Sequence, residues 1–219
     1  MGFHAASPGP STTWAKFAEG KIVLSSKEPR AGYVSRVNKN GNTVYEEHHD
    51  AFTGVLQEVQ ISESEYGKQF IFRFFDGTQY YNITASYSSR YSKTMLNALA
   101  SPAVDLQDQI TLVPYSFKND KDKSVVGVTI QQRGVKVPPA YDKTTLPPLR
   151  EVKIKGQIQY DDTEIMDFLE ARLNDTIRPR VGMGAPVKHD TIDEQLQKTF
   201  AAQPVHAGSD DGDTPDLPF

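Results

Sequence analysis

The sequence contains no cysteine among its 219 residues. Without thiols the chain forms no disulfide framework, no thiolate zinc site and no cysteine nucleophile, and this composition suits a reducing cytoplasm. Long apolar runs are also missing, because none approaches the roughly 18 residues that a membrane span requires. Residues 1–6 lack the basic and apolar regions of a signal peptide. We therefore expect a soluble, cytoplasmic protein that has no contact with a membrane.

Common catalytic and cofactor-binding motifs are absent as well. The sequence has no glycine-rich phosphate loop, no His-Glu-x-x-His and no Gly-x-Ser-x-Gly. The neighbouring His48 and His49 would point to opposite faces of a strand and could not easily share a metal ion. Asp161 and Asp162 precede a predicted helix, where they suit its N-terminal dipole better than paired-carboxylate catalysis. We expect no enzymatic activity, no cofactor and no metal.

Charge is distributed unevenly along the chain. Residues 1–155 carry 19 Lys and Arg against 15 Asp and Glu, a net charge of +4. Residues 156–219 carry 5 against 13, a net charge of −8. A mildly basic body followed by an acidic end is typical of charge-steered binding, although solubility alone also explains an acidic end.

Most of the chain up to residue 136 is predicted to form β-strands, with turn signals between them. The strongest hairpin signal is Asp76-Gly77, which lies between two aromatic-rich runs and supplies the positive φ of a tight turn. The predicted strands cover residues 21–25, 31–38, 43–62, 69–75, 78–86, 109–117 and 124–132.

One amphipathic helix interrupts these strands at residues 89–100, where four apolar side chains fall on one helical face. Ser88 or Ser89 can cap its start, and Pro102 follows its end. This order predicts a mainly β fold with a single OB-fold, which is a five-stranded Greek-key barrel with one helix between strands 3 and 4. A plain β-sandwich is the main alternative.

The C-terminal part is predicted to hold a strand at residues 151–160, an extra helix at 163–173 and a short helix at 192–200. Beyond residue 200 no apolar positions recur, and we expect disorder. The predicted organisation is a flexible N-terminal arm (1–15), an OB-fold domain with a strand and helix extension (16–175), a linker (176–200) and a disordered acidic tail (201–219).

Aromatic and basic residues in the strands are the candidate ligand contacts. A barrel core uses one face of each strand, so the aromatics of the opposite face remain to stack on nucleic-acid bases, while nearby cations contact phosphates. Filling of the β core is the competing explanation for any single ring. The candidate DNA-binding residues are Tyr33, Tyr45, Arg73, Phe75, Tyr80, Tyr81, Tyr115, Lys118, Lys121 and Lys123.

The chain ends in four acidic residues, Asp210, Asp211, Asp213 and Asp216, followed by Leu217, Pro218 and Phe219. The final Asp-Leu-Pro-Phe resembles the acidic C-terminal tip of bacterial single-stranded DNA-binding proteins. Body and tail together resemble the T7-type single-stranded DNA-binding proteins of bacteriophages, which combine one OB-fold, an extra helix and an acidic tail ending in Phe.

This resemblance implies a protein that binds and protects single-stranded DNA without sequence specificity in replication or recombination, within the host cytoplasm. It also implies that the tail binds replication proteins such as a polymerase, helicase or primase, with Phe219 entering an apolar pocket. A homodimer is left open. A single-strand annealing recombination protein and a structural or interaction β-domain are the alternatives.

Overall fold

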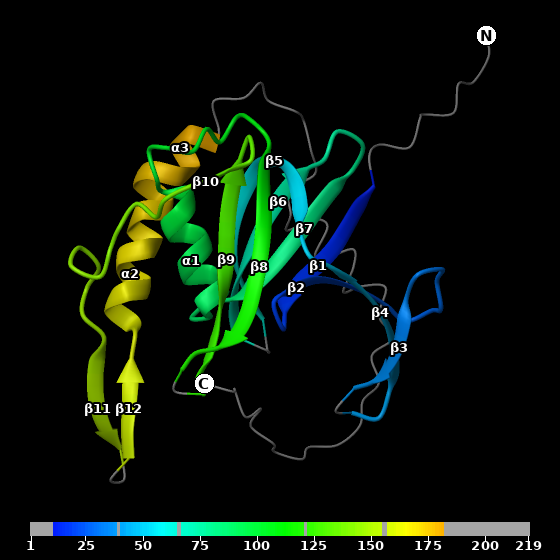
Figure 1. Cartoon of the computed structure of the whole chain (residues 1–219), viewed down its shortest axis with the longest axis horizontal. Helices are drawn as coiled ribbons and strands as arrows, with labels where there is room; N and C mark the ends of the chain where they lie inside the picture. The colour runs from blue at the N-terminus through cyan, green and yellow to red at the C-terminus, as the bar shows by residue number, and fades with distance from the viewer. Residues whose placement is uncertain (1–10, 39, 65–66, 121, 155–156, 182–219) are drawn as a thin grey trace. The chain divides into compact units, whose positions relative to one another are not determined.

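A computed structural model describes residues 11–38, 40–64, 67–120, 122–154 and 157–181 (Figure 1). The chain divides into two units, Met1–Gly184 and Ala185–Phe219. The described residues all belong to the first unit, so the predicted tail and the helix predicted at residues 192–200 lie outside them.

Ten strands of the described chain form one sheet in the order β10-β9-β8-β5-β6-β7-β1-β2-β4-β3. The pairs are antiparallel except for β1 and β7, which run parallel. A separate two-stranded sheet consists of β11 (Arg150–Ile154) and β12 (Gln157–Asp161). The strands of the large sheet are β1 (Thr12–Ala18), β2 (Lys21–Ser26), β3 (Val34–Val37), β4 (Thr43–His49), β5 (Phe52–Ser64), β6 (Gly67–Phe75), β7 (Tyr80–Ser86), β8 (Ile110–Lys118), β9 (Ser124–Gln132) and β10 (Val135–Lys136).

This topology shows that the prediction of a single five-stranded OB barrel is wrong, and one large sheet also differs from a sandwich. Two long-range pairings produce the larger sheet. The 13-residue β5 pairs with both β6 and β8, and β1 joins β7 in parallel. The second pairing draws residues assigned to the N-terminal arm into the sheet and adds β2, β4 and β3 beyond them.

The predicted helix is confirmed as α1 (Arg90–Leu99). The side chain of Ser89 accepts a hydrogen bond from the backbone N–H of Ser92 and so caps the helix, as expected of a serine there. The second helical segment comprises α2 (Thr163–Arg172), a π-helical turn (Leu173–Ile177) and α3 (Arg178–Val181). Figure 1 shows α1, α2 and α3 on the same side of β8 and β9.

The hydrophobic core fills the inner face of the sheet, defined here as the face that carries Phe70, Phe72 and Phe74 of β6. These three side chains are fully buried together with Ile83 of β7. Helix α1 packs on this face, and the second helical segment forms the next layer. The second helical segment contributes four buried residues to the same core, Met166, Leu169, Leu173 and Ile177.

Arg180 fixes the second helical segment against the end of α1. Its Nη1 donates hydrogen bonds to the carbonyl oxygens of Leu99 and Ser101 at 3.2 and 3.0 Å. These are carbonyls at a helix end that have no partner within the helix. Arg180 therefore satisfies the C-terminus of α1 with a charged donor.

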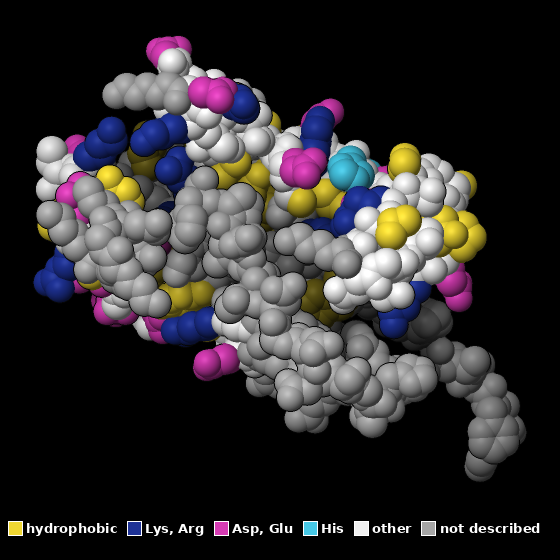
Figure 2. All heavy atoms as spheres, turned by 90° about the horizontal axis from the view of Figure 1, so that it is seen from below, with side chains coloured by type: hydrophobic (Ala, Val, Ile, Leu, Met, Phe, Trp, Pro, Cys, Tyr) yellow, Lys and Arg dark blue, Asp and Glu magenta, His cyan; other side chains and the backbone are white. Residues whose placement is uncertain are grey.

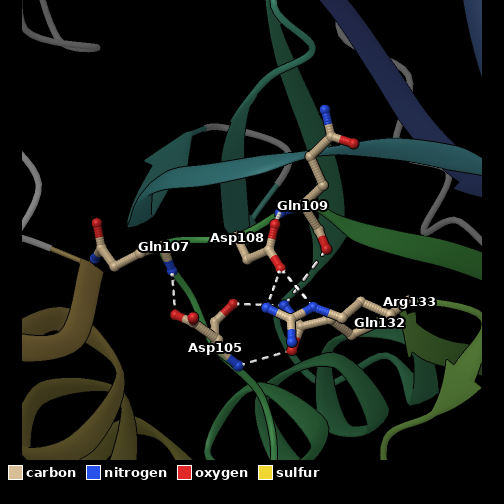
Figure 3. A network of polar contacts seen from close by, with 6 residues as sticks. All are labelled: Asp105, Gln107, Asp108, Gln109, Gln132 and Arg133. Atoms are coloured by element: carbon tan, nitrogen blue, oxygen red, sulfur yellow. Dashed lines mark hydrogen bonds and ion pairs between the residues drawn. The ribbon is translucent and has the colours of Figure 1, made fainter.

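A second polar network fixes the loop after α1 to the end of β9 (Figure 3). The amide of Asp105 donates to the side-chain oxygen of Gln132 at 2.9 Å, and Gln132 donates back to the Asp105 carbonyl at 2.7 Å. Arg133 forms an ion pair with Asp108 at 2.8 Å. The loop thus holds its position by reciprocal hydrogen bonds.

The turn between β1 and β2 packs directly against β8. Gly20 has a φ of +76°, and a Cβ atom placed on it would lie 2.6 Å from the backbone nitrogen of Ser116. Its own amide donates to the hydroxyl of Tyr91 on α1 at 2.8 Å. The sheet therefore curls until its β1–β2 turn meets β8, and only glycine fits this contact.

Gly20→Ala tests how much stability depends on this contact. Gly41 has the same backbone conformation, a φ of +77°, but no atom lies within 4 Å of its hypothetical Cβ. Gly41→Ala should cost about 1–2 kcal/mol from the left-handed backbone alone, and Gly20→Ala should cost at least about 1 kcal/mol more because it also overpacks the contact. Urea unfolding measures both. Equal losses would show that the close packing contributes nothing.

Candidate nucleic-acid interface

The outer face of the sheet, opposite to the core, carries Ile71, Arg73 and Phe75 of β6. Cross-strand register extends this face to β8, because Val55 pairs with Phe75 and Thr53 pairs with Thr111. Side chains two residues apart share a face, so Tyr115 and Phe117 of β8 also belong to the outer face.

Tyr115 and Phe117 form an aromatic pair near the end of β8, in which Phe117 is exposed and Tyr115 is half-buried. Phe117 is 55% exposed, and the two ring centroids are 5.8 Å apart. Tyr115 pairs across the strands with Gly127. A Cβ atom on Gly127 would lie 2.7 Å from the Cζ atom of Tyr115, so the ring rests against a backbone without a side chain. We call Tyr115 and Phe117 the aromatic platform.

Two lysines adjoin the aromatic platform at the β8–β9 hairpin. Lys118 and Lys123 are exposed, and Lys118 forms an ion pair with Asp122 at 2.8 Å. Such a surface pair contributes at most about 1 kcal/mol, so Lys118 can exchange Asp122 for a phosphate. Lys121 lies outside the described residues.

A second group of cations lies on the outer face around Glu46 of β4, which is 5% exposed. Arg36 of β3 donates two hydrogen bonds to this carboxylate at 2.8 and 2.7 Å. Lys16 of β1 lies 3.3 Å from the same carboxylate, and Nε2 of His48 lies 3.6 Å from it. The Arg36 guanidinium holds the pKa of Glu46 at about 2, although burial opposes this effect; Lys16 adds to it.

Charges of both signs are mixed on the molecular face shown in Figure 2, where Lys and Arg side chains alternate with Asp and Glu. Attraction of a polyanion to such a surface depends on local cations and not on one extended field.

Arg73, Phe75 and Tyr80 pack against one another on the outer face. Arg73 and Tyr80 are each 4% exposed, and the guanidinium carbon of Arg73 lies 4.5 Å from the centroid of the Tyr80 ring. The rings of Phe75 and Tyr80 have centroids 5.0 Å apart. Burial leaves little of these predicted contact residues for a base to stack on.

Tyr33 and Tyr81 lie apart from the aromatic platform and line a pocket of about 610 Å³ on the inner face, together with Arg30 and Phe52. Tyr81 packs edge-on against Phe52. Two carboxylates, of Glu47 and Asp76, also line this pocket and oppose phosphate binding.

Tyr45 has a half-buried side chain on β4, in register with Ser26 and Ser35. Of the predicted contacts among the described residues, Tyr115, Lys118 and Lys123 lie close together in the chain at the β8–β9 hairpin. Tyr115 is half-buried and both lysines are exposed, and strand alternation places Lys118 on the opposite face from Phe117. The predicted partner-binding residues Asp210, Asp211, Asp213, Asp216, Leu217, Pro218 and Phe219 lie outside the described residues.

Phe117 is not among the predicted contact residues, although it is exposed beside Tyr115. Exposed positions favour tyrosine over phenylalanine, because the tyrosine hydroxyl tolerates water. The spacing was available as a signal, since Phe117 lies two residues after Tyr115 and a strand places both on one face.

Comparisons of the chain with protein-family models, with curated proteins and with solved structures found no match. Among the described residues, no group of three or more His, Asp or Glu side chains is arranged to hold a metal ion. The helices in this part of the chain are too short or too polar to cross a membrane.

Glu46 should make stability depend on pH. Its folded pKa of about 2 lies below the ordinary value of 4.5, so its contribution is complete above about pH 4.5 and is lost as the pH falls toward 2. Glu46→Gln should lower the free energy of unfolding at pH 7, and the difference from wild type should shrink between pH 5 and pH 3. Urea unfolding followed by the fluorescence of Trp14, the single tryptophan, measures this.

Glu47→Gln is the matched control, because Glu47 is the next residue and faces the opposite side of the sheet. Its substitution should leave the pH dependence of stability as in wild type. A constant difference between wild type and Glu46→Gln across this pH range would contradict the assignment.

Proposed function

We propose that the protein binds single-stranded DNA without sequence specificity and acts in DNA replication or recombination. The observation that carries the proposal is the aromatic platform, in which the half-buried ring of Tyr115 lies beside the exposed ring of Phe117 at a hairpin that also carries two exposed lysines. Every base has a π-face, so stacking on aromatic rings contributes about 1–3 kcal/mol per base whatever the sequence. The lysines supply the phosphate contacts that make such binding sensitive to salt.

The geometry of the aromatic platform supports stacking of successive bases. Tyr115 is fixed by its contact with Gly127, whereas Phe117 is half exposed beside it. A ring held by packing loses little conformational freedom on binding, which favours affinity. Phe117 therefore offers the open surface, and Tyr115 sets the orientation of the pair.

The acidic C-terminal tail completes the proposal. Its carboxylates compete with phosphates for cations when DNA is absent, and its last residues, Leu217 to Phe219, recruit a replication protein when DNA occupies the interface. The net charges of +4 for residues 1–155 and −8 for the remainder support this competition.

Phe117→Ala should weaken binding to oligo-dT by about 1–3 kcal/mol, roughly 5- to 150-fold, because one stacking surface is lost. The slope of log K against log salt should stay as in wild type, since no charge is removed. Fluorescence anisotropy of a labelled oligonucleotide at several salt concentrations measures both quantities.

Tyr160→Ala is the matched control, because Tyr160 is also a highly exposed aromatic residue but lies on β12, outside the large sheet. Its affinity should equal that of wild type. Equal affinities of all three proteins would reject the aromatic platform, and absence of any binding by wild type would favour a structural β-domain.

Deletion of residues 210–219 should tighten binding to oligo-dT at low salt and abolish binding to the replication partner. Phe219→Ala keeps all four carboxylates, so it should lose the partner and keep the DNA affinity of the full chain. Anisotropy titrations and pull-downs with a purified polymerase, helicase and primase measure these effects. The tail has neither role if the deletion changes nothing.

A single-strand annealing protein remains the second candidate. Such a protein assembles into rings or filaments and accelerates the pairing of complementary strands, whereas a coating protein does not need to assemble in this way. An annealing assay combined with electron microscopy separates the two activities.

A further inference from the structure

The cations around Glu46 lie on the same face of the sheet as the aromatic platform. Lys16 of β1 pairs with Val23, and Val23 pairs with His48. Lys16 also pairs with Thr84, which pairs with Ile71 on the outer face of β6. Register alone therefore places Lys16 and His48 on the outer face, as it does Tyr115 and Phe117.

The curl of the sheet brings this group toward β8. The β1–β2 turn touches β8 at Gly20 and Ser116, the residue between the two platform rings. Lys21 follows this turn directly and belongs to the outer face, since it pairs with Ala18 two positions after Lys16. The order of outer-face side chains from the turn is thus Lys21, Lys16 and then the residues around Glu46.

Two cations converge on the Glu46 carboxylate, and the carboxylate of Glu19 in the β1–β2 turn also acts on Arg36. The side chains of Lys16 and Arg36 are 45% and 48% exposed, whereas that of Glu46 is 6% exposed. The carboxylate therefore lies beneath the cations and holds their charged groups at the surface. Lys21 forms an ion pair with Asp50, whose side chain is almost fully exposed, and so adds no net charge.

We propose that Lys16 and Arg36, oriented by Glu46, bind phosphodiester groups of a DNA strand that extends from the aromatic platform across the β1–β2 turn. This inference rests on the proposed function and adds the path of the backbone to it. Arg36 suits the role because its planar guanidinium can bond Glu46 and a phosphate at the same time.

Phosphate contacts are measured by the salt dependence of binding, because each one releases condensed counterions and adds about 0.7 to the slope of log K against log salt for a single strand. Removal of Lys16 and Arg36 alone would leave Glu46 buried without a partner. The test therefore compares Glu46→Gln with the triple variant Lys16→Gln/Arg36→Gln/Glu46→Gln, which differ only in the two cations.

The triple variant should bind oligo-dT with a slope smaller by about 1.4 than Glu46→Gln, and its affinity at 50 mM salt should fall on the order of tenfold per lost contact. Arg133→Gln/Asp108→Asn removes an exposed ion pair at the far end of the β8–β9 hairpin and should keep the wild-type slope. Equal slopes for the triple variant and Glu46→Gln overturn the inference. The proposed function still stands in that case if wild type binds oligo-dT and Phe117→Ala weakens the binding. Failure of wild type to bind oligo-dT overturns both.

Lysine acetylation of the wild-type chain provides a measurement that does not depend on the folding of a variant. Oligo-dT should protect Lys16 from an N-hydroxysuccinimide ester, as judged by mass spectrometry, and should leave the exposed Lys143 unprotected. Equal modification of Lys16 with and without oligo-dT contradicts the inference.

Discussion

The contact between the β1–β2 turn and β8 is the constraint on which both the core and the proposed interface depend. It requires a residue without a side chain at Gly20, in a backbone conformation that favours glycine. Because the turn meets β8, the sheet curls around Phe70, Phe72 and Phe74. The hydroxyl of Tyr91 on α1 accepts a hydrogen bond from the Gly20 amide, and its ring stacks on that of Phe17 with centroids 5.2 Å apart. Helix packing and closure of the sheet therefore support each other.

The outer face has a packed centre and two exposed ends. In the centre, the guanidinium of Arg73 lies over the Tyr80 ring and Ile71 is fully buried, so these side chains stabilise the sheet. One end presents Phe117, and the other presents Lys16 and Arg36 above a buried carboxylate. Apolar stacking and charge are therefore separated on one surface, which suits a ligand with flat apolar bases and a charged backbone.

Local signals in the sequence predicted the first helix correctly, whereas the single strands predicted at 43–62 and 151–160 are two strands each, β4 with β5 and β11 with β12. Helix α1 and its Ser89 cap follow from apolar spacing and capping chemistry within about a dozen residues. The topology cannot be predicted from such local signals, because the parallel pairing of β1 with β7 joins segments some 68 residues apart. The periodicity of a strand does not indicate which other strand it pairs with. The exposure of the strand aromatics could not be predicted, for a related reason. Strand alternation places both Tyr80 and Phe117 on the outer face. Only tertiary packing decides that Tyr80 is covered and Phe117 is not.

The mixed surface charge also determines how the acidic tail can act. At physiological ionic strength a charge is screened over about 8 Å, so the −8 of residues 156–219 cannot weaken a distant interface through space. The proposed competition with DNA therefore requires direct exchange with a phosphate at a particular cation. Each of the three cations already has one carboxylate partner. Lys118 pairs with the exposed Asp122, whereas Lys16 and Arg36 share Glu46, which is buried beneath them. Under the proposal, the second anion at Lys16 and Arg36 comes from the tail or from DNA, because their first anion, Glu46, is buried beneath them.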